Sequence, residues 1–313
     1  MRIAVVGAGA VGGYYGGALA RHGEQVVLIC RGAHRDAIVR DGLQVSSHWG
    51  DFTVHVPATA DPHEVGPVDL IIYAVKTYHN PDALPLLEPL IDEDTAVLSI
   101  QNGVESPARI AAVYGWEHVL AGTTYIDAAR PAPGRIEQVG ATARIVLGEQ
   151  DGSHSPRAAR VADVLTKEGM QVEVSDDIAS SLWAKLVQVA ATGTVMTASR
   201  ATYLEVLACP VGALTVRTVM EETVAVGQAH GAKFASDVVD VRMATAEADA
   251  PGLVSSLQLD FQAGNPLELD DLLGAVVRQG RAKQVPVPAS AALYTALYRF
   301  RQGHDAGREL GGV

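Results

Sequence analysis

The chain has 313 residues, enough for two domains with a hydrophobic core in each. Hydrophobic residues make up 48% and charged residues 19%, which is typical of a globular protein and excludes a disordered one. The formal net charge of −12 argues against a nucleic-acid partner, and no apolar run approaches the ~20 residues that span a bilayer.

The first residues predict a strand, a glycine-rich turn and a helix. Arg2–Val6 is a short β-branched run typical of a buried parallel strand, and a helix of small residues is expected from about Val11 to His22. The turn between them is Gly7-Ala8-Gly9-Ala10-Val11-Gly12. In a G-x-G-x-x-G turn the first glycine allows a tight bend, the second lets a pyrophosphate approach, and the third lets the helix pack closely. A second strand over Gln25–Ile29 completes the order that predicts dinucleotide binding, the alternative being a glycine-rich turn without nucleotide.

Strands and helices are expected to alternate up to about residue 175. The further expected strands are Leu43–Ser47, Phe52–Val56, Val68–Val75, Ala96–Ile100, Val119–Ile126, Arg135–Val139, Ala143–Leu147 and Gln171–Val174, and the expected helices are Pro81–Ile91 and Ser155–Glu168. The continuous apolar run Val68–Val75 predicts a central parallel strand. Together these elements predict a doubly wound sheet with a partly antiparallel extension.

Helical patterns dominate from Asp176 onward. The expected helices cover about 178–197, 204–231, 235–248, 267–282 and 288–302, and the glycine-rich tail Gly303–Val313 is expected to fray. We therefore predict an α/β protein, with an N-terminal Rossmann-type doubly wound sheet over residues 1–176 and an all-helical C-terminal domain over residues 177–313. The helical domain would supply the substrate and catalytic groups, and the cleft between the domains is the expected substrate site.

The end of the second strand indicates which dinucleotide binds. NAD-selective folds usually place an acid there, on the ribose 2′-hydroxyl, but this chain has Ile29-Cys30-Arg31. Arg31 is placed to meet a 2′-phosphate through charge-assisted hydrogen bonds, and His34 and Arg35 would add positive charge. These residues favour NADP(H) over NAD(H), the alternative being that Arg31 is only a solvated surface residue.

Polar residues follow two neighbouring expected strands. Lys76 comes directly after Val68–Val75, and Gln101-Asn102-Gly103 comes directly after Ala96–Ile100. Both groups should lie at the carboxyl edge of the sheet, where ligands bind in this fold.

One lysine and one acid in the helical half are the candidates for proton transfer. Lys185 stands alone in a largely apolar helix, where burial would lower its pKa and make it a useful proton donor. The alternative is a structural lysine whose stem lies along the helix while its ammonium reaches water. Glu268 lies at the start of another expected helix and offers a carboxylate partner.

Together these features resemble the ketopantoate reductase (2-dehydropantoate 2-reductase) family over nearly the whole chain. The matching motifs are Gly7-Ala8-Gly9-Ala10-Val11-Gly12, Val75-Lys76, Gln101-Asn102-Gly103-Val104, Leu182-Trp183-Ala184-Lys185-Leu186, Ser255-Ser256, Pro266-Leu267-Glu268-Leu269-Asp270 and Gln284-Val285-Pro286-Val287-Pro288. Each motif is loose on its own, but their order and spacing together are specific.

The resemblance implies an NADPH-dependent oxidoreductase that reduces a 2-keto acid, with a place in pantothenate biosynthesis. Lys185 would protonate the ketone oxygen as hydride arrives from the nicotinamide, Glu268 would hold Lys185, and Ser256 would bind the substrate carboxylate. The residues implied to contact the cofactor are Gly7, Ala8, Gly9, Ala10, Val11, Gly12, Arg31, Lys76, Asn102, Ala128 and Glu268, with Asn102 and Glu268 on the nicotinamide ribose and Ala128 contributing a main-chain group. Asn102 and Lys185 are also implied to contact the substrate.

One departure from the family pattern bears on the substrate. Family members that reduce ketopantoate typically carry asparagines four and eight residues after the lysine, and here these positions are Val189 and Gly193. An i+4 residue shares the face of Lys185, so Val189 makes that face apolar. Gln188 and Thr192, at other spacings, are the polar residues that would contact the substrate instead. Because a missing hydrogen-bond partner can lower discrimination by up to ~10⁴-fold, a more apolar 2-keto acid or a related carbonyl compound is expected.

Alternatives remain open within this scaffold. They are a D-2-hydroxyacid dehydrogenase, a specialised carbonyl reductase, and a non-catalytic NADP(H)-binding regulator, although retention of Lys185 and Glu268 argues against the regulator. Cys30 and Cys209 provide neither a disulfide framework nor a metal cluster, so a cytoplasmic protein without a bound metal is expected. We expect a small-molecule substrate, no nucleic-acid or membrane partner, and a homodimer formed through the helical domain as the candidate assembly.

Overall fold

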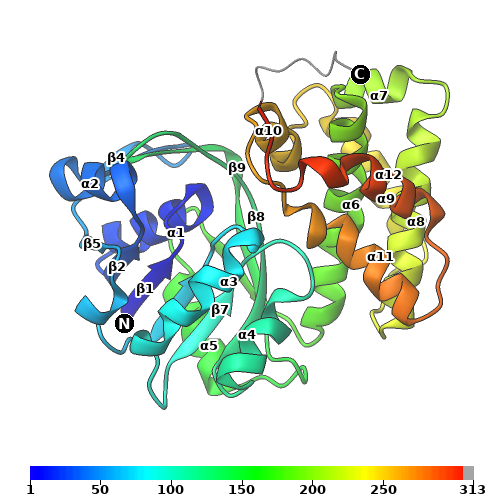
Figure 1. Cartoon of the computed structure of the whole chain (residues 1–313). Helices are drawn as coiled ribbons and strands as arrows, with labels where there is room; N and C mark the ends of the chain where they lie inside the picture. The colour runs from blue at the N-terminus through cyan, green and yellow to red at the C-terminus, as the bar shows by residue number, and fades with distance from the viewer. Residues whose placement is uncertain (306–313) are drawn as a thin grey trace. The chain divides into compact units, whose positions relative to one another are not determined.

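The structure is a computed structural model, and it describes residues 1–305. Contacts within the chain divide it into two compact units. The first, here called the sheet unit, contains Met1–Gln101 and Ser106–Ile178, and the second, the helical unit, contains Asn102–Glu105 and the described residues from Ala179 onward. In Figure 1 the sheet unit runs from blue to green and most of the helical unit from green to red.

A ten-stranded sheet forms the centre of the sheet unit. Its strands are β1 Arg2–Val6, β2 Gln25–Ile29, β3 Leu43–Ser47, β4 Phe52–Val54, β5 Ala58–Thr59, β6 Leu70–Tyr73, β7 Ala96–Ser99, β8 Val119–Ala132, β9 Arg135–Gly148 and β10 Gln171–Val174. The order across the sheet is β4-β3-β9-β8-β7-β6-β1-β2-β5, with β10 paired to β9. Strands β5, β2, β1, β6, β7 and β8 run parallel, whereas β8 and β9 form a long antiparallel hairpin. The chain therefore changes direction across the sheet between β1 and β6, which is where doubly wound folds bind ligands.

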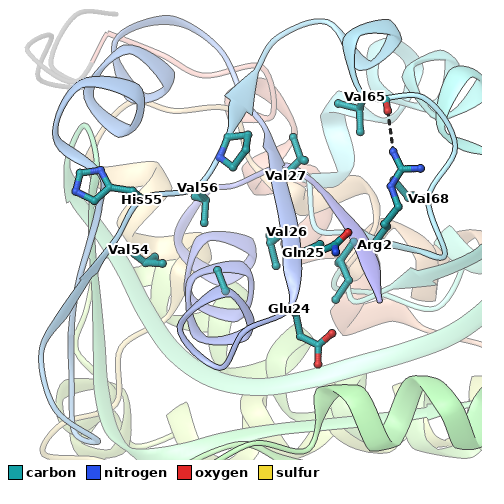
Figure 2. Close-up of a pocket in the computed structure, with 13 residues that line it drawn as sticks. Arg2, Glu24, Gln25, Val26, Val27, Val54, His55, Val56, Val65 and Val68 are labelled. Carbon is teal, nitrogen blue, oxygen red and sulfur yellow. Dashed lines mark hydrogen bonds between the residues drawn. The ribbon is translucent and has the colours of Figure 1, made fainter.

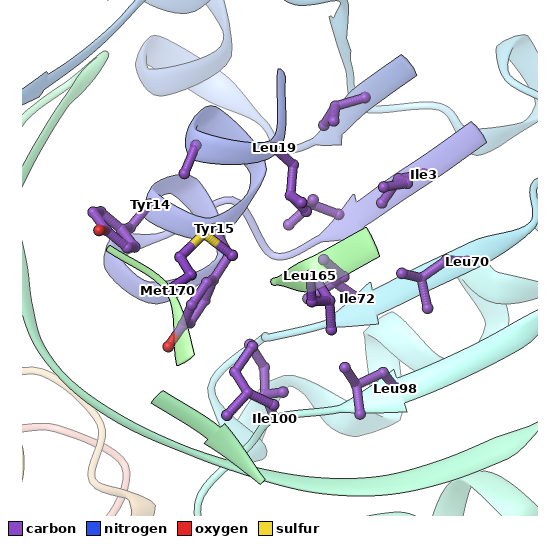
Figure 3. Close-up of a cluster of buried hydrophobic side chains, with 14 of the residues drawn as sticks. Ile3, Tyr14, Tyr15, Leu19, Leu70, Ile72, Leu98, Ile100, Leu165 and Met170 are labelled. Atoms are coloured by element: carbon purple, nitrogen blue, oxygen red, sulfur yellow. The ribbon is translucent and has the colours of Figure 1, made fainter. Parts of the chain in front are cut away.

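Helices cover both faces of this sheet. The described α-helices of the unit are α1 Ala10–Arg21, α2 Gly32–Asp41, α3 Asn80–Ala83, α4 Ser106–Tyr114 and α5 Pro156–Leu165, with 3₁₀ turns η1 Pro62–Glu64, η2 Thr77–His79 and η3 Leu84–Leu90. Alternate residues of β1 enter two cores, with Ile3 and Val5 in the core of α1 and α5, and Ala4 and Val6 in the core of α4. Figure 3 shows the first core, in which side chains of α1 and of β1, β6 and β7 meet.

Helix α1 packs unusually close to the sheet because it is rich in glycine. A Cβ atom added at Gly13, Gly16 or Gly17 would lie within 2.9 Å of a side chain of β9, β2 or β3, respectively. Glycine weakens an isolated helix, so these residues are explained by packing rather than by helix propensity. The close approach places the first turn of α1 directly beside the end of β1.

The helical unit is built around a long apolar helix. Its described helices are α6 Ile178–Ser199, α7 Tyr203–Ala208, α8 Gly212–Ala229, α9 Val238–Asp249, α10 Ser256–Gln262, α11 Leu273–Ala282 and α12 Pro288–Leu297, with 3₁₀ turns η4 Glu268–Asp270 and η5 Tyr298–Phe300. Leu186, Val187, Ala190 and Ala191 of α6 are buried in the core of this unit. A helix that is apolar around most of its surface is one that its neighbours cover.

The predicted fold class is confirmed, but several predicted elements were wrong in detail. The helix expected over 81–91 is only one α turn followed by η3, because Pro85 and Pro89 interrupt the α-helical hydrogen bonds. The helix expected over 204–231 is divided into α7 and α8, and Pro210 lies at the break. The helix expected from 267 begins as η4, and α2, α4 and α10 were not predicted. Of the tail expected to fray, residues 306–313 lie outside the described residues.

Two long strands replace three predicted short ones. The runs expected at Val119–Ile126, Arg135–Val139 and Ala143–Leu147 belong to β8 and β9, each 14 residues long. Exposed polar and small residues in the middle of the hairpin hid this continuity from the hydrophobic pattern. Across residues 1–305, no helix combines the length and the apolar character that crossing a bilayer requires.

Candidate cofactor and catalytic sites

The three glycines of the turn after β1 have different surroundings. Gly7 has φ of +93°, and a Cβ there would lie 2.6 Å from the Val75 backbone nitrogen. A Cβ at Gly12 would lie 2.4 Å from the Gly7 carbonyl oxygen, whereas a Cβ at Gly9 would meet nothing within 4 Å. Gly7 and Gly12 are therefore required by the fold, while Gly9 borders open space that a pyrophosphate could occupy.

The same turn leads into the amino end of α1. Gly9 is the N-cap residue, and the Gly13 N–H donates to the Gly9 carbonyl over 2.8 Å. The N–H groups of the first helical residues, Ala10, Val11 and Gly12, have no acceptor within the helix. No acidic side chain lies in this first turn, so the positive end of the helix is available to an anion.

The end of β6 lies beside this turn. The Ala74 N–H donates to the Val6 carbonyl over 2.9 Å, and Gln101 Nε2 donates to the Val75 carbonyl over 2.8 Å. The half-buried Lys76 follows as the N-cap residue of η2. Gln101 thus has a positioning role, since it fixes the strand end that carries Lys76.

Positively charged groups gather near the end of β2. Arg31 is exposed and caps α2, and among residues 1–305 it has no ion pair. Burial lowers the pKa of His79, and the charge of Arg31 lowers it further, so the two residues are within electrostatic reach. Arg35 pairs with the neighbouring Asp36 at 2.6 Å, which offsets part of its charge.

A third guanidinium group comes from the β8–β9 hairpin. Burial raises the pKa of the Cys30 thiol to about 11, and the charges of Arg35 and Arg130 oppose that rise. Arg130 is therefore within electrostatic reach of the end of β2, and no sequence pattern indicated this. Ala128 is on the same part of β8, just beyond a bulge, and is paired with Gln138.

A chain of hydrogen bonds links the three candidate polar residues of the helical unit. Lys185 Nζ donates to Asn102 Oδ1 over 2.9 Å, and Asn102 Nδ2 donates to Glu268 Oε2 over 3.3 Å. Glu268 is only 5% exposed. Burial lowers the pKa of Lys185 to about 8, and the negative charge of Glu268 opposes that shift. An ammonium with this pKa can give up its proton near neutral pH.

Asn102 is held in this cluster by the residues that follow it. Gly103 has φ of +93°, and a Cβ there would lie 2.5 Å from the Asp271 carbonyl oxygen. Glu105 accepts hydrogen bonds of 2.7 Å from Arg278 Nη2 and from Gln279 Nε2. The sequence did not predict this clamp, which ties the segment Asn102–Glu105 to η4 and α11.

The side of α6 that carries Lys185 is mixed rather than uniformly apolar. Gln188 and Thr192 are three and seven residues after Lys185 and so share its face along with Val189. Thr192 is buried, and its hydroxyl donates to the Gln188 carbonyl over 2.9 Å. The neighbouring Gln188 is half-buried.

Ser255, the neighbour of the predicted Ser256, is the serine that approaches α6. A Cβ at Gly193 would lie 2.9 Å from Ser255 Oγ, and Ser255 is half-buried. Ser256, the residue expected to bind a carboxylate, is the exposed first residue of α10. The two serines are adjacent in the sequence, so the motif alone could not distinguish them.

A cavity in the sheet unit is unrelated to the predicted site. It measures about 350 Å³ and lies around the start of β1 and β2 (Figure 2). Its lining includes Arg2, Glu24, Gln25, His55 and Val65, and the Arg2 guanidinium donates to the Val65 carbonyl over 3.1 Å. These residues lie at the amino ends of the parallel strands, opposite the edge where such folds bind nucleotides.

No metal centre is evident in the described part of the chain. Residues 1–305 contain no group of three or more histidine, cysteine, aspartate or glutamate side chains arranged to hold an ion.

Comparisons with known proteins cover almost the whole chain. The family model "Ketopantoate reductase PanE/ApbA" matches residues 3–152, and "Ketopantoate reductase PanE/ApbA C terminal" matches residues 177–300. The 2-dehydropantoate 2-reductase of Mesorhizobium japonicum is 31% identical over 96% of this chain and 98% of its own length.

Solved structures agree. A PanE/ApbA family ketopantoate reductase from Ralstonia eutropha JMP134 has a TM-score of 0.89 and 33% identity, covering 96% of this chain and 98% of the other. The 2-dehydropantoate 2-reductase of Geobacter metallireducens has a TM-score of 0.90 and 32% identity, covering 96% and 99%. The chain therefore belongs to the ketopantoate reductase family of oxidoreductases.

Proposed function

We propose that this protein is an NADPH-dependent reductase of a 2-keto acid. The observation that carries the proposal is the hydrogen-bonded series Lys185–Asn102–Glu268 in the helical unit. This series combines a lysine of lowered pKa with a buried carboxylate. These are the groups needed to protonate an oxygen that gains negative charge. A protein that only sensed the dinucleotide would need neither group.

The sheet unit fits the cofactor. The open space at Gly9 and the first N–H groups of α1 suit a pyrophosphate, with Lys76 contributing positive charge. Arg31 supports a preference for the 2′-phosphate of NADP(H), and Arg130 adds to the positive field. Ala128, on the same strand as Arg130, would contribute a main-chain contact.

The chemistry divides between cofactor and protein. The nicotinamide, when bound, supplies the hydride to the carbonyl carbon. Lys185 stabilises the developing charge on the carbonyl oxygen and transfers its proton to it. Asn102 holds the ammonium in place and Glu268 offsets its charge. After proton transfer, the neutral amine of Lys185 can regain a proton from water near neutral pH, because its pKa of about 8 lies above that pH.

The substrate we propose is a 2-keto acid with an apolar side chain. Val189 and Gly193 supply no amide on the face of α6 near Lys185, and Ser255 lies against Gly193 where an asparagine side chain would otherwise extend. Gln188, Thr192 and the serine pair are the polar groups left for the substrate carboxylate. Ketopantoate, which carries a hydroxyl group, should therefore be a weaker substrate than an apolar analogue.

The cellular setting follows from the same proposal. We propose that the protein acts in the cytoplasm, and reduction of ketopantoate would place it in pantothenate biosynthesis. A homodimer through the helical unit is supported by exposed apolar side chains at Leu204, Val211 and Leu214, which are 51–63% exposed. Light scattering of the wild type and of Leu214→Lys would distinguish a dimer from a monomer.

The test is an assay of NADPH oxidation over a panel of 2-keto acids that includes ketopantoate, repeated with NADH. We expect turnover with NADPH, with the highest kcat/KM for a 2-keto acid with an apolar side chain. Binding of NADPH without turnover of any carbonyl compound in the panel would favour a non-catalytic regulator instead.

A further inference from the structure

A buried histidine connects the glycine-rich turn to the β8–β9 hairpin. His34 lies in α2 and is 5% exposed. Its Nε2 is 2.7 Å from the Ala8 carbonyl oxygen, and its Nδ1 is 2.9 Å from the Gly134 backbone nitrogen. One imidazole ring thus bridges two backbone segments that are more than a hundred residues apart in sequence, both within the sheet unit.

The two partners fix the form of the ring. The Gly134 N–H can only donate, so Nδ1 must present its lone pair, and Nε2 must carry the proton that is donated to the Ala8 carbonyl. The ring is therefore neutral, so the expectation that His34 would add positive charge beside Arg31 was wrong. Burial lowers the pKa of His34, and the positive charge of Arg130 lowers it further, which favours the same neutral form.

Each ring nitrogen of His34 bonds to a backbone turn that contains glycine. Ala8 lies between Gly7, with φ of +93°, and Gly9, so the turn has few side chains of its own to hold it. At the other end, Gly134 has φ of +73°, and a Cβ there would lie 2.9 Å from Ala37 Cβ of α2. The hairpin turn is thus packed firmly on α2 and can serve as the fixed end.

We propose that His34 is a positioning residue for the dinucleotide, which it serves by holding the Ala8 carbonyl so that the turn before α1 is ordered before the cofactor binds. This inference rests on the proposed function, because it assumes that the pyrophosphate binds at Gly9 and the first N–H groups of α1. An ordered turn binds more tightly because the conformational entropy of its glycines is already lost in the free protein.

Three substitutions test the two hydrogen bonds of the His34 ring one at a time. His34→Gln can keep a donor for the Ala8 carbonyl, His34→Asn can keep an acceptor for the Gly134 N–H, and His34→Phe keeps the volume of the ring with neither. His118→Asn is the matched control, because His118 also bonds a backbone carbonyl, that of Thr95, but lies just before the amino end of β8.

The experiment measures the Kd of NADPH by titration calorimetry and the thermal unfolding of each unliganded variant. We expect His34→Phe and His34→Asn to raise the Kd roughly five- to tenfold, the effect of about 1 kcal/mol for one hydrogen bond. His34→Gln and His118→Asn should stay within about twofold of the wild type. At saturating NADPH the His118→Asn control should keep the wild-type kcat, whereas the loss in the two His34 variants should appear in the Kd of NADPH.

The outcomes distinguish a failure of this role for His34 from a failure of the proposed function. If the wild type binds NADPH but His34→Phe and His34→Asn lower only the unfolding temperature and leave the Kd unchanged, His34 is merely structural and this inference is overturned. If His34→Gln loses as much affinity as His34→Phe, the Ala8 bond is not the cause. A wild type that binds neither NADPH nor NADH would overturn the proposed function, and this inference with it.

Discussion

Lys185 illustrates how a single position acquires chemistry from its surroundings. Its burial removes water from the ammonium and lowers the pKa to about 8, while Glu268 limits the fall. Asn102 orients the ammonium of Lys185, because its side-chain oxygen accepts from the lysine and its side-chain nitrogen donates to the carboxylate of Glu268. The sequence indicated all three residues, but not that the side chain of Asn102 would stand between the other two.

The lowered pKa predicts opposite pH profiles for the two directions of the reaction. Reduction needs the protonated lysine, so kcat/KM for the keto acid should be level below pH about 8 and fall above it. Oxidation of the hydroxy acid needs the neutral lysine, so its kcat/KM should rise through the same range. Initial rates from pH 6 to pH 10 in both directions measure this. Two profiles with the same sign would show that another group titrates.

Arg31 predicts the cofactor preference. Arg31→Ala should weaken NADPH binding by ~1.5–3 kcal/mol, the usual contribution of a hydrogen bond to a charged group, and should affect NADH little. Dissociation constants of both cofactors for wild type and variant measure this difference. Equal losses for NADPH and NADH would mean that Arg31 does not contact the 2′-phosphate, and Arg130 would then be the next arginine to test.

At the level of elements, the glycine turn and α1 show which features could be predicted. Apolar runs identified the parallel strands because those strands are buried on both faces, and the order of strand, turn and helix identified the nucleotide-binding unit. Helix α2 was missed because its composition is polar, with only His34, Ala37 and Ile38 buried. Its anchoring role depends on hydrogen bonds to distant backbone groups, for which a sequence pattern gives no signal.

The different surroundings of Gly9 and Gly12 predict that alanine substitutions at these positions affect stability and cofactor affinity differently. Gly12→Ala should lower the free energy of unfolding by about 3 kcal/mol, because its methyl group would meet the Gly7 carbonyl oxygen. Gly9→Ala should cost less than ~1 kcal/mol, the difference between these residues at an N-cap, yet raise the Kd of NADPH roughly tenfold or more. Urea unfolding and cofactor titration of both variants test this. A Gly9→Ala protein with normal cofactor affinity would contradict the proposed pyrophosphate position.

Helix α6 predicts the substrate preference. Val189→Asn should raise kcat/KM for ketopantoate. An amide that meets the substrate hydroxyl would stabilise the transition state by up to ~1–3 kcal/mol. The kcat/KM for an apolar 2-keto acid should not rise, because Lys185 and Glu268 are unchanged. The comparison needs both substrates assayed with both proteins. A wild type that is already efficient on ketopantoate, with a slower variant, would show that Gln188 or Thr192 makes this contact.

For the molecule as a whole, the residues proposed for cofactor binding and for proton transfer belong to two separately packed units. The glycine-rich turn and Arg31 belong to the sheet unit, whereas Lys185, Glu268 and also Asn102 belong to the helical unit. The segment Asn102–Glu105 follows β7 in sequence but packs with η4 and α11, so the chain passes between the units at the residue that orients the lysine. Sequence patterns placed Asn102 with the sheet, because long-range packing on Asp271 and Arg278 leaves no local signal.

The role of Lys185 that we propose is to supply the proton for reduction by NADPH. It is tested most directly by measuring kcat of the wild type and of Lys185→Ala side by side, at saturating NADPH and with the best 2-keto acid. We predict that kcat falls by ~10²–10⁴, the usual contribution of general acid catalysis, while the Kd of NADPH changes little. A variant that turns over within a few-fold of the wild type would show that Lys185 is only a structural lysine and not the proton donor.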